Sequence, residues 1–233
     1  MAKRFVDWPR AWRVISTRYP PINLFERLTP DPAVWEALIA LEQLTNPRLR
    51  DELGEIVLVP PEDRVTGPGA SYVMASFTNL NPKGSRFSDG TFGVYYAASA
   101  LETAIAETIF HFESFARDSG DPIRGEEMRV LVGVIAADFE DVFVLPEEQR
   151  LPILAADTYG ESQAYAKRLR AGGADGVVYP SVRAPGGECA GAFRPRAVGL
   201  PQQERRLKYR WNGSRVDRYF DYLQDRWIEV GIQ

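Results

Sequence analysis

The amino-acid sequence predicts an α+β fold, in which a mixed and largely antiparallel β-sheet is flanked by helices. Apolar runs of strand length are mixed with helical segments, without the β-α-β alternation of a doubly wound sheet. Residues Met128–Ala136 alternate in character along the chain, as a half-buried strand does. The dipeptide Asn212-Gly213 lies between two further runs and is a strong signal for an antiparallel hairpin.

The first third of the chain is predicted to open with an irregular arm, residues 1–22, which is aromatic, basic and interrupted by prolines. This arm is expected to hold a short helical turn near Trp8–Ile15. The predicted elements that follow are a strand at Asn23–Leu28, a helix from Asp31 to Leu44, a short helix at Arg48–Leu53, and strands at Glu55–Val59 and Ser71–Thr78. A polar loop, Asn79–Asp89, comes next and carries Arg86.

The segment from residue 92 to residue 115 predicts a buried strand followed by a capped helix. Phe92–Ala98 is apolar or aromatic throughout and opens after the turn signal Asp89-Gly90. Ser99 and Glu102 have the spacing of a capping box. The apolar stripe expected on the helix consists of Leu101, Ile105, Thr108, Phe112 and Phe115. Glu107 lies off this stripe, roughly 120° from its centre at about 100° per residue, so its carboxylate can point into a cleft.

The second half of the chain supplies the remaining predicted strands. They are Met128–Ala136, Val142–Leu145, Gly176–Val182, Gly191–Arg194 and the hairpin pair Arg206–Trp211 and Ser214–Phe220, with a helix at Ser162–Ala171. Gly172-Gly173 suits the end of that helix. Pro180 marks an edge or the end of its strand, because proline cannot donate to the ladder. With no repeat, low-complexity tract or linker, residues 1–233 are interpreted as a single domain that includes a C-terminal hairpin at 205–222.

Composition excludes several classes of function. The net charge of −4 and the pI of about 5.3 argue against a nucleic-acid partner. One histidine, His111, and one cysteine, Cys189, cannot build a zinc site of Cys and His ligands. A lone cysteine also fits a reducing compartment. The N-terminal segment lacks the apolar core of a signal peptide, and no run approaches the roughly 20 residues that span a bilayer, so a cytoplasmic protein without a membrane partner is expected.

Four short motifs then suggest a family. They are Gly84-Ser85-Arg86-Phe87, the run from Val94 to Ser99, Ala106-Glu107 and Tyr179-Pro180-Ser181. In their order and spacing they resemble the RES domain, over roughly Asn23 to Val198. The resemblance implies a fold similar to the ADP-ribosyltransferases, degradation of NAD⁺ by hydrolysis or phosphorolysis, and the role of a toxin in a toxin–antitoxin pair. The partner that it implies is an Xre-type helix-turn-helix antitoxin.

The resemblance also implies the site residues. Arg86 matches the arginine of the Gly-x-Arg-aromatic motif, Tyr96 the family tyrosine ten residues on, and Glu107 the glutamate eleven residues further. Ser181 matches the serine after Tyr-Pro, and Arg27 resembles the arginine carried on the first strand. Two features depart from the family. Residues 34–77 look like an insertion, and Arg194-Pro195 stands where Asn-Pro is common.

The implied reaction explains these residue types. In NAD⁺ the leaving nicotinamide departs as a neutral molecule, and the barrier lies in positive charge that develops on the ribose. The Glu107 carboxylate is expected to stabilise that charge, while Arg86 and Arg27 would bind the diphosphate. Tyr96 would offer a flat face and a hydroxyl, and Ser181 a small hydroxyl near the nicotinamide ribose. No metal is required, and inorganic phosphate is a candidate co-substrate.

Several alternatives stay open on the sequence. Glu107 could be a solvated helix flank, and of Tyr95 and Tyr96 only one can line a pocket because they alternate on a strand. Ser181 lacks a G-x-S-x-G elbow, which excludes a serine hydrolase. His111 is interpreted as structural, and Cys189 is placed in a glycine-rich loop. The competing functions are transfer of ADP-ribose to a protein and a non-catalytic binding module; the oligomeric state, including a homo-oligomer, is left open.

Overall fold

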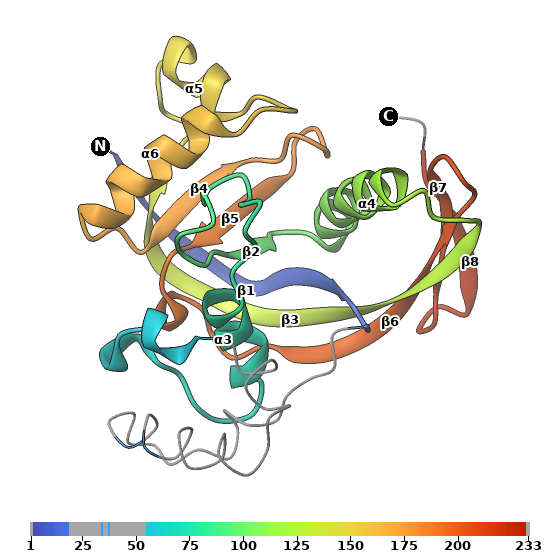
Figure 1. Ribbon diagram of the computed structural model, residues 1–233, viewed down its shortest axis with the longest axis horizontal. Coiled ribbons are helices and arrows are strands. Elements are labelled where there is room, and N and C mark those ends of the chain that lie inside the picture. The colour runs from blue at the N-terminus through green and yellow to red at the C-terminus, as the bar shows by residue number, and fades with distance from the viewer. Residues whose placement is uncertain (1, 19–33, 35–36, 38–54, 232–233) are drawn as a thin grey trace.

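Two long strands, β1 (Lys3–Ser16) and β3 (Arg124–Asp141), run along a strongly curved sheet (Figure 1). The computed structural model describes residues 2–18, 34, 37 and 55–231. β1 and β3 pair antiparallel from Lys3 opposite Glu140 to Ser16 opposite Met128. The described residues therefore form the mixed, largely antiparallel α+β architecture that the sequence predicts.

The described strands make one eight-stranded sheet in the order β1-β2-β5-β4-β3-β6-β7-β8. The further strands are β2 (Tyr95–Ala98), β4 (Gly176–Pro180), β5 (Glu188–Ala192), β6 (Gln202–Trp211), β7 (Val216–Asp221) and β8 (Arg226–Glu229). Among them only β3 and β4 pair in parallel. β1 also meets β2 where Trp12 lies opposite Ala98, so β1, β2, β5, β4 and β3 close into a ring of strands.

Helices cover both faces of the curved sheet. The described helices are α3 (Ala70–Thr78), α4 (Leu101–Asp118), α5 (Glu147–Ile153) and α6 (Gly160–Ala171), with short 3-10 turns η2 (Ile56–Leu58), η3 (Pro61–Asp63) and η4 (Pro195–Ala197). In Figure 1, α4 lies on the concave side of the sheet and α3 on the opposite side. One buried apolar cluster contains α4 and α6 side chains such as Ile105 and Leu169, and a second contains Val73, Met74 and Phe77 of α3. No helix of the described chain is long and apolar enough to cross a bilayer.

The prediction of an irregular N-terminal arm is wrong. Residues expected to be irregular, with a helical turn near Trp8–Ile15, form β1 instead. The prolines suggested a break, but Pro9 lies within the register shift between Trp8 and Ala11, where a bulge removes the need for its missing N–H. A proline at a bulge is compatible with a long strand.

Two expected strands before the central unit are also wrong. Ser71–Thr78 lies in helix α3, whose buried apolar residues Ala70, Val73, Met74 and Phe77 recur at helical spacing. A short apolar run cannot be assigned to a strand or a helix by its length alone. Glu55–Val59 contains the 3-10 turn η2 in place of a strand.

The predicted cap of α4 is wrong as well. The N-cap residue is Ala100, and it makes no side-chain capping bond. The Ser99 hydroxyl donates to the Glu188 carbonyl at 3.4 Å instead, and the Ser99 N–H donates to the same carbonyl at 3.0 Å. Ser99 therefore prolongs the pairing of β2 with β5. On the helix itself Ile105 is buried, whereas Phe115 is half exposed.

Later elements follow the prediction more closely. Met128–Ala136 lies within β3, the helix predicted at Ser162–Ala171 is α6, and the strand at Gly176 ends at Pro180. The Asn212-Gly213 hairpin is confirmed: it joins β6 to β7, and Gly213 has φ +98°. Val142–Leu145 is a turn, and the strand predicted at Gly191–Arg194 runs from Glu188 to Ala192. Helix α5 and strand β8 were not predicted.

Candidate active site

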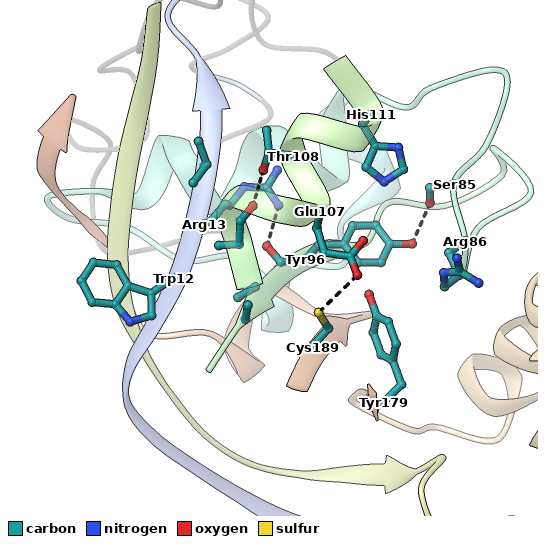
Figure 2. Close-up of a pocket in the computed structure, with 14 residues that line it drawn as sticks. Trp12, Arg13, Ser85, Arg86, Tyr96, Glu107, Thr108, His111, Tyr179 and Cys189 are labelled. Atoms are coloured by element: carbon teal, nitrogen blue, oxygen red, sulfur yellow. Dashed lines mark hydrogen bonds between the residues drawn. The ribbon is translucent and has the colours of Figure 1, made fainter. Parts of the chain in front are cut away.

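A cavity of about 260 Å³ lies between α4 and the strands of the closed ring (Figure 2). Its wall is formed by β1, β2 and α4, the start of the 85–88 loop, and single residues of β4 and β5. The lining residues are Trp12, Arg13, Val14, Ser85, Arg86, Tyr96, Ala97, Ala98, Ala104, Glu107, Thr108, His111, Tyr179 and Cys189. Three of the predicted site residues, Arg86, Tyr96 and Glu107, are thus brought to one cavity from separate parts of the chain.

Glu107 projects from the flank of α4 that the sequence predicted, and it is half-buried. Its Oε1 accepts a hydrogen bond of 2.6 Å from the Ser181 hydroxyl, and the Cys189 thiol lies 3.9 Å from the same oxygen. Among the described residues none donates to Oε2. One carboxylate oxygen is therefore held in place by the protein, and the other is free to meet a ligand.

Ser181 does not line the cavity, but it donates a hydrogen bond to Glu107, which does. It is 9% exposed and follows β4. Its oxygen accepts the N–H groups of Arg183 at 3.2 Å and Ala184 at 2.9 Å while its proton goes to Glu107. The structure thus places Ser181 against the carboxylate and gives its hydroxyl the role of an orienting group.

Arg86 enters the cavity from the loop that precedes β2, and it is 7% exposed. Its Nη1 donates to the carbonyls of Ala155 at 2.8 Å and Ile153 at 3.4 Å, and its guanidinium lies 4.7 Å from the ring centre of Tyr159. Within the described part of the chain, Arg86 has no carboxylate partner, and Nε and Nη2 have no hydrogen-bond acceptor. A buried cation of this kind is a ready binding group for an anion.

Tyr96 and Tyr95 point to opposite sides of β2, as their alternation predicted. Tyr95 is buried in the second apolar cluster, whereas Tyr96 lines the cavity. The Tyr96 hydroxyl lies 2.8 Å from the Ser85 hydroxyl and accepts the Phe87 N–H at 2.9 Å. Tyr96 therefore makes hydrogen bonds with the residues on both sides of Arg86. Burial raises the pKa of Tyr96 to about 12, so the hydroxyl stays protonated at neutral pH.

A second arginine, Arg13, lines the cavity and was not among the predicted site residues. Arg27, the residue expected on the first strand, lies outside the described residues. The first described strand is β1, and it carries Arg13, whose Nη1 donates to the Tyr96 carbonyl at 2.9 Å. Among the described residues Arg13 has no acidic partner and its buried Nε has no acceptor. Loss of hydration lowers the pKa of Arg13. Recognising residues 3–16 as a strand would have pointed to this arginine.

Three further titratable side chains border the carboxylate. The Tyr179 hydroxyl points toward Glu107 in Figure 2, and burial raises the pKa of Tyr179 well above its usual value. Cys189 lies on β5 and not in a loop as expected; burial, then the nearby Glu107 carboxylate, raises its pKa. His111 stands at the exposed rim, where partial loss of hydration lowers its pKa against the opposing pull of Glu107.

Arg194, the departure from the family pattern, lies away from the cavity. Its guanidinium pairs with Asp63 at 3.0 Å and with Asp175 at 3.5 Å. Asp63 is 3% exposed and also pairs with Arg196 at 3.0 Å. The arginine therefore ties the turn η3 to the end of β5. In the described chain no group of three or more His, Cys, Asp or Glu side chains could hold a metal ion.

A model of the RES domain matches residues 61–212, which is more than half of the chain. The chain belongs to the RES domain family. It is also 29% identical over 210 residues to an uncharacterised protein, y4oC, of Sinorhizobium fredii, covering 88% of this chain and 84% of that protein. The range matched by the family model includes the loop of Arg86 and the helix of Glu107.

Among solved structures, the crystal structure of the M. tuberculosis MbcT–MbcA toxin–antitoxin complex gives a TM-score of 0.38 at 13% identity, covering 57% of this chain and 74% of that one. A likeness of this size shows neither an activity nor a partner for this chain. The chemical capacity of the site follows from its own geometry: one carboxylate with a free oxygen, two arginines without acidic partners among the described residues, and a tyrosine ring beside them.

Proposed function

We propose that this RES domain protein cleaves the bond between nicotinamide and ribose in NAD⁺. The observation that carries the proposal is that Glu107 and Arg86 line one cavity, from different walls (Figure 2). A dinucleotide offers a diphosphate for a cation and a cationic ribosyl pyridinium for a carboxylate. A site that holds a half-buried glutamate and a buried arginine with no carboxylate partner among the described residues meets both demands.

In the proposed reaction the bond from ribose C1′ to the pyridinium nitrogen breaks, and its electron pair neutralises the ring. Positive charge grows on C1′ and the ring oxygen, and the Glu107 carboxylate stabilises it. A water oxygen then bonds to C1′ and loses one proton, which gives ADP-ribose, nicotinamide and H⁺. With inorganic phosphate as the nucleophile the product is ADP-ribose-1″-phosphate. The Ser181 hydrogen bond keeps Oε1 fixed, so Oε2 is the oxygen assigned to the substrate.

The size of the cavity supports a partial enclosure of the substrate. At about 260 Å³ it is slightly smaller than the roughly 300–1,000 Å³ common for pockets that enclose a drug-sized ligand. It would take the nicotinamide and its ribose, with the diphosphate at Arg86. Arg13, on the β1 wall, is a second candidate for the diphosphate or for a ribose hydroxyl.

Membership in the RES family supports the biological role that we propose: the toxin of a toxin–antitoxin pair, acting in the cytoplasm and restrained by an Xre-type helix-turn-helix antitoxin. The second candidate function is transfer of ADP-ribose to a protein, because the same bond breaks and only the acceptor differs. We prefer a small nucleophile because Glu107 and Tyr179 line the same cavity, which is small.

The proposal is tested by incubating purified protein with NAD⁺, with and without inorganic phosphate, and separating the products. We expect free nicotinamide together with ADP-ribose, or with its 1″-phosphate when phosphate is present. Label from NAD⁺ that appears on a cellular protein, with little free product, would favour the transferase. Absence of nicotinamide release under all conditions, with NAD⁺ binding also absent by calorimetry, would leave a binding module.

A further inference from the structure

The tripeptide Ser85-Arg86-Phe87 is held by polar contacts from β2, from α6 and from the carbonyls of Ile153 and Ala155. Tyr96 holds it from β2 through the Ser85 hydroxyl and the Phe87 N–H. Two side chains of α6, about 76 residues later in the sequence, also contact its backbone carbonyls. No signal in the sequence links α6 to the site, because its residues do not line the cavity.

Ser162 makes the central contact from α6. Its side chain is completely buried, and its hydroxyl lies 2.5 Å from the carbonyl of Arg86 and 2.9 Å from the carbonyl of Tyr159. One hydroxyl proton is shared between the backbone of the arginine and the backbone of the residue whose ring stacks on its guanidinium. Ser162 therefore holds the main chain of Arg86 directly, and it holds the guanidinium indirectly, through the residue that carries the stacked ring.

Gln163 makes the neighbouring contact. Its amide Nε2 donates to the carbonyl of Ser85 at 3.0 Å, and the side chain is half-buried. Gly84 precedes this carbonyl with φ +72°, and a Cβ there would lie 2.4 Å from the carbonyl of Ser88 and 3.0 Å from the Gln163 amide. The amide of Gln163 therefore packs closely against the tight turn before Arg86, where only a glycine leaves room for it.

We infer that Ser162 and Gln163 are positioning residues, which fix the direction of Arg86 and so the affinity for the diphosphate. This inference rests on the proposed function. It predicts a specific kinetic signature, because the diphosphate keeps its charge while the ribose bond breaks. A group that binds substrate and transition state equally raises KM when it is lost and leaves kcat unchanged.

The experiment compares wild type with Ser162→Ala and Gln163→Glu. The second variant is nearly isosteric and places a carboxylate oxygen against the Ser85 carbonyl. For both variants we expect KM for NAD⁺ to rise roughly three- to tenfold, the size of one lost hydrogen bond, with kcat within about twofold of wild type. ADP-ribose, used as the calorimetric probe, should bind more weakly by the same factor. Thr78→Val, which removes a buried hydroxyl that donates to the Met74 carbonyl on the far face of the sheet, should match wild type.

The outcomes separate this inference from the proposed function. Unchanged KM and ADP-ribose affinity in both variants, or a fall in kcat alone, would overturn the positioning role. If Ser162→Ala does not fold, Gln163→Glu decides, because its side chain is only half-buried. A wild type that binds ADP-ribose but releases no nicotinamide would defeat the proposed reaction while the affinity comparison still judges Ser162 and Gln163. A wild-type protein that neither binds ADP-ribose nor releases nicotinamide would overturn both the positioning role and the proposed reaction.

Discussion

The Ser181 hydroxyl donates a hydrogen bond of 2.6 Å to Oε1 of Glu107, across 74 positions of the sequence. Because the same oxygen accepts two backbone N–H groups, its proton has a single direction. A serine arranged in this way orients a carboxylate, and it is not placed to attack a substrate. The two residues that the sequence assigned to separate roles form one unit.

Removing this contact should slow the chemical step. For Ser181→Ala we expect kcat for nicotinamide release to fall by about tenfold, because one hydrogen bond to a charged group is lost and Glu107 gains freedom. KM should change little. Ser181→Thr keeps the hydroxyl and should retain most of the activity. An alanine variant with unaltered kcat would show that Glu107 needs no support from Ser181.

The Tyr96 hydroxyl should contribute to stability as well as to the site. Tyr96→Phe leaves the Phe87 N–H without its acceptor, and an unsatisfied buried donor costs about 1–3 kcal/mol. Urea denaturation should show this loss. Tyr222→Phe, which removes an exposed hydroxyl bonded to Glu127, should change the free energy of unfolding by less than about 0.5 kcal/mol. Equal effects at the two positions would contradict the structural assignment.

The thiol of Cys189 should be unreactive in the folded protein. Burial and the neighbouring Glu107 carboxylate raise its pKa, so the thiolate fraction at pH 8 is smaller than in the unfolded chain. Mass spectrometry should find almost no alkylation by iodoacetamide in native protein and full alkylation in urea. Since the chain has one cysteine, no second thiol complicates the measurement. Rapid native labelling would indicate an accessible thiolate.

The single histidine allows a clean test of pH dependence. The folded state lowers the pKa of His111, so on acidification the unfolded chain takes up this proton first. The His111 contribution to stability is therefore complete only above the unfolded value of about 6.5, and it is lost as pH falls from there through the lower pKa of the folded state. We expect wild type to lose more stability between about pH 7.5 and pH 5.5 than His111→Gln does. A steeper loss in the variant would reverse the sign of the shift.

The sequence located the central unit because its signals are local. The turn at Asp89-Gly90, the alternation of Tyr95 and Tyr96 and the flank position of Glu107 depend on neighbours only a few residues away. The hairpin at Asn212-Gly213 is of the same kind. These features needed no knowledge of tertiary contacts.

What the sequence could not predict depends on long-range packing. Pro9 suggested a break in the chain, so β1 was not predicted and Arg13 was not among the predicted site residues. The Ser99 hydroxyl matched a capping box, but the Glu188 carbonyl on β5 competes for it. The contacts of Ser162 with Arg86 and of Ser181 with Glu107 join segments more than 70 residues apart, and no local pattern encodes them.

The most direct test of the central claim is nicotinamide release by Glu107→Gln beside wild type, at saturating NAD⁺. Glutamine keeps the size of the side chain and can still accept the Ser181 hydrogen bond, but it carries no charge to stabilise the developing cation. We predict a loss of at least about 100-fold in kcat, with a thermal unfolding midpoint close to that of wild type. A folded Glu107→Gln protein that releases nicotinamide at the wild-type rate would contradict the account.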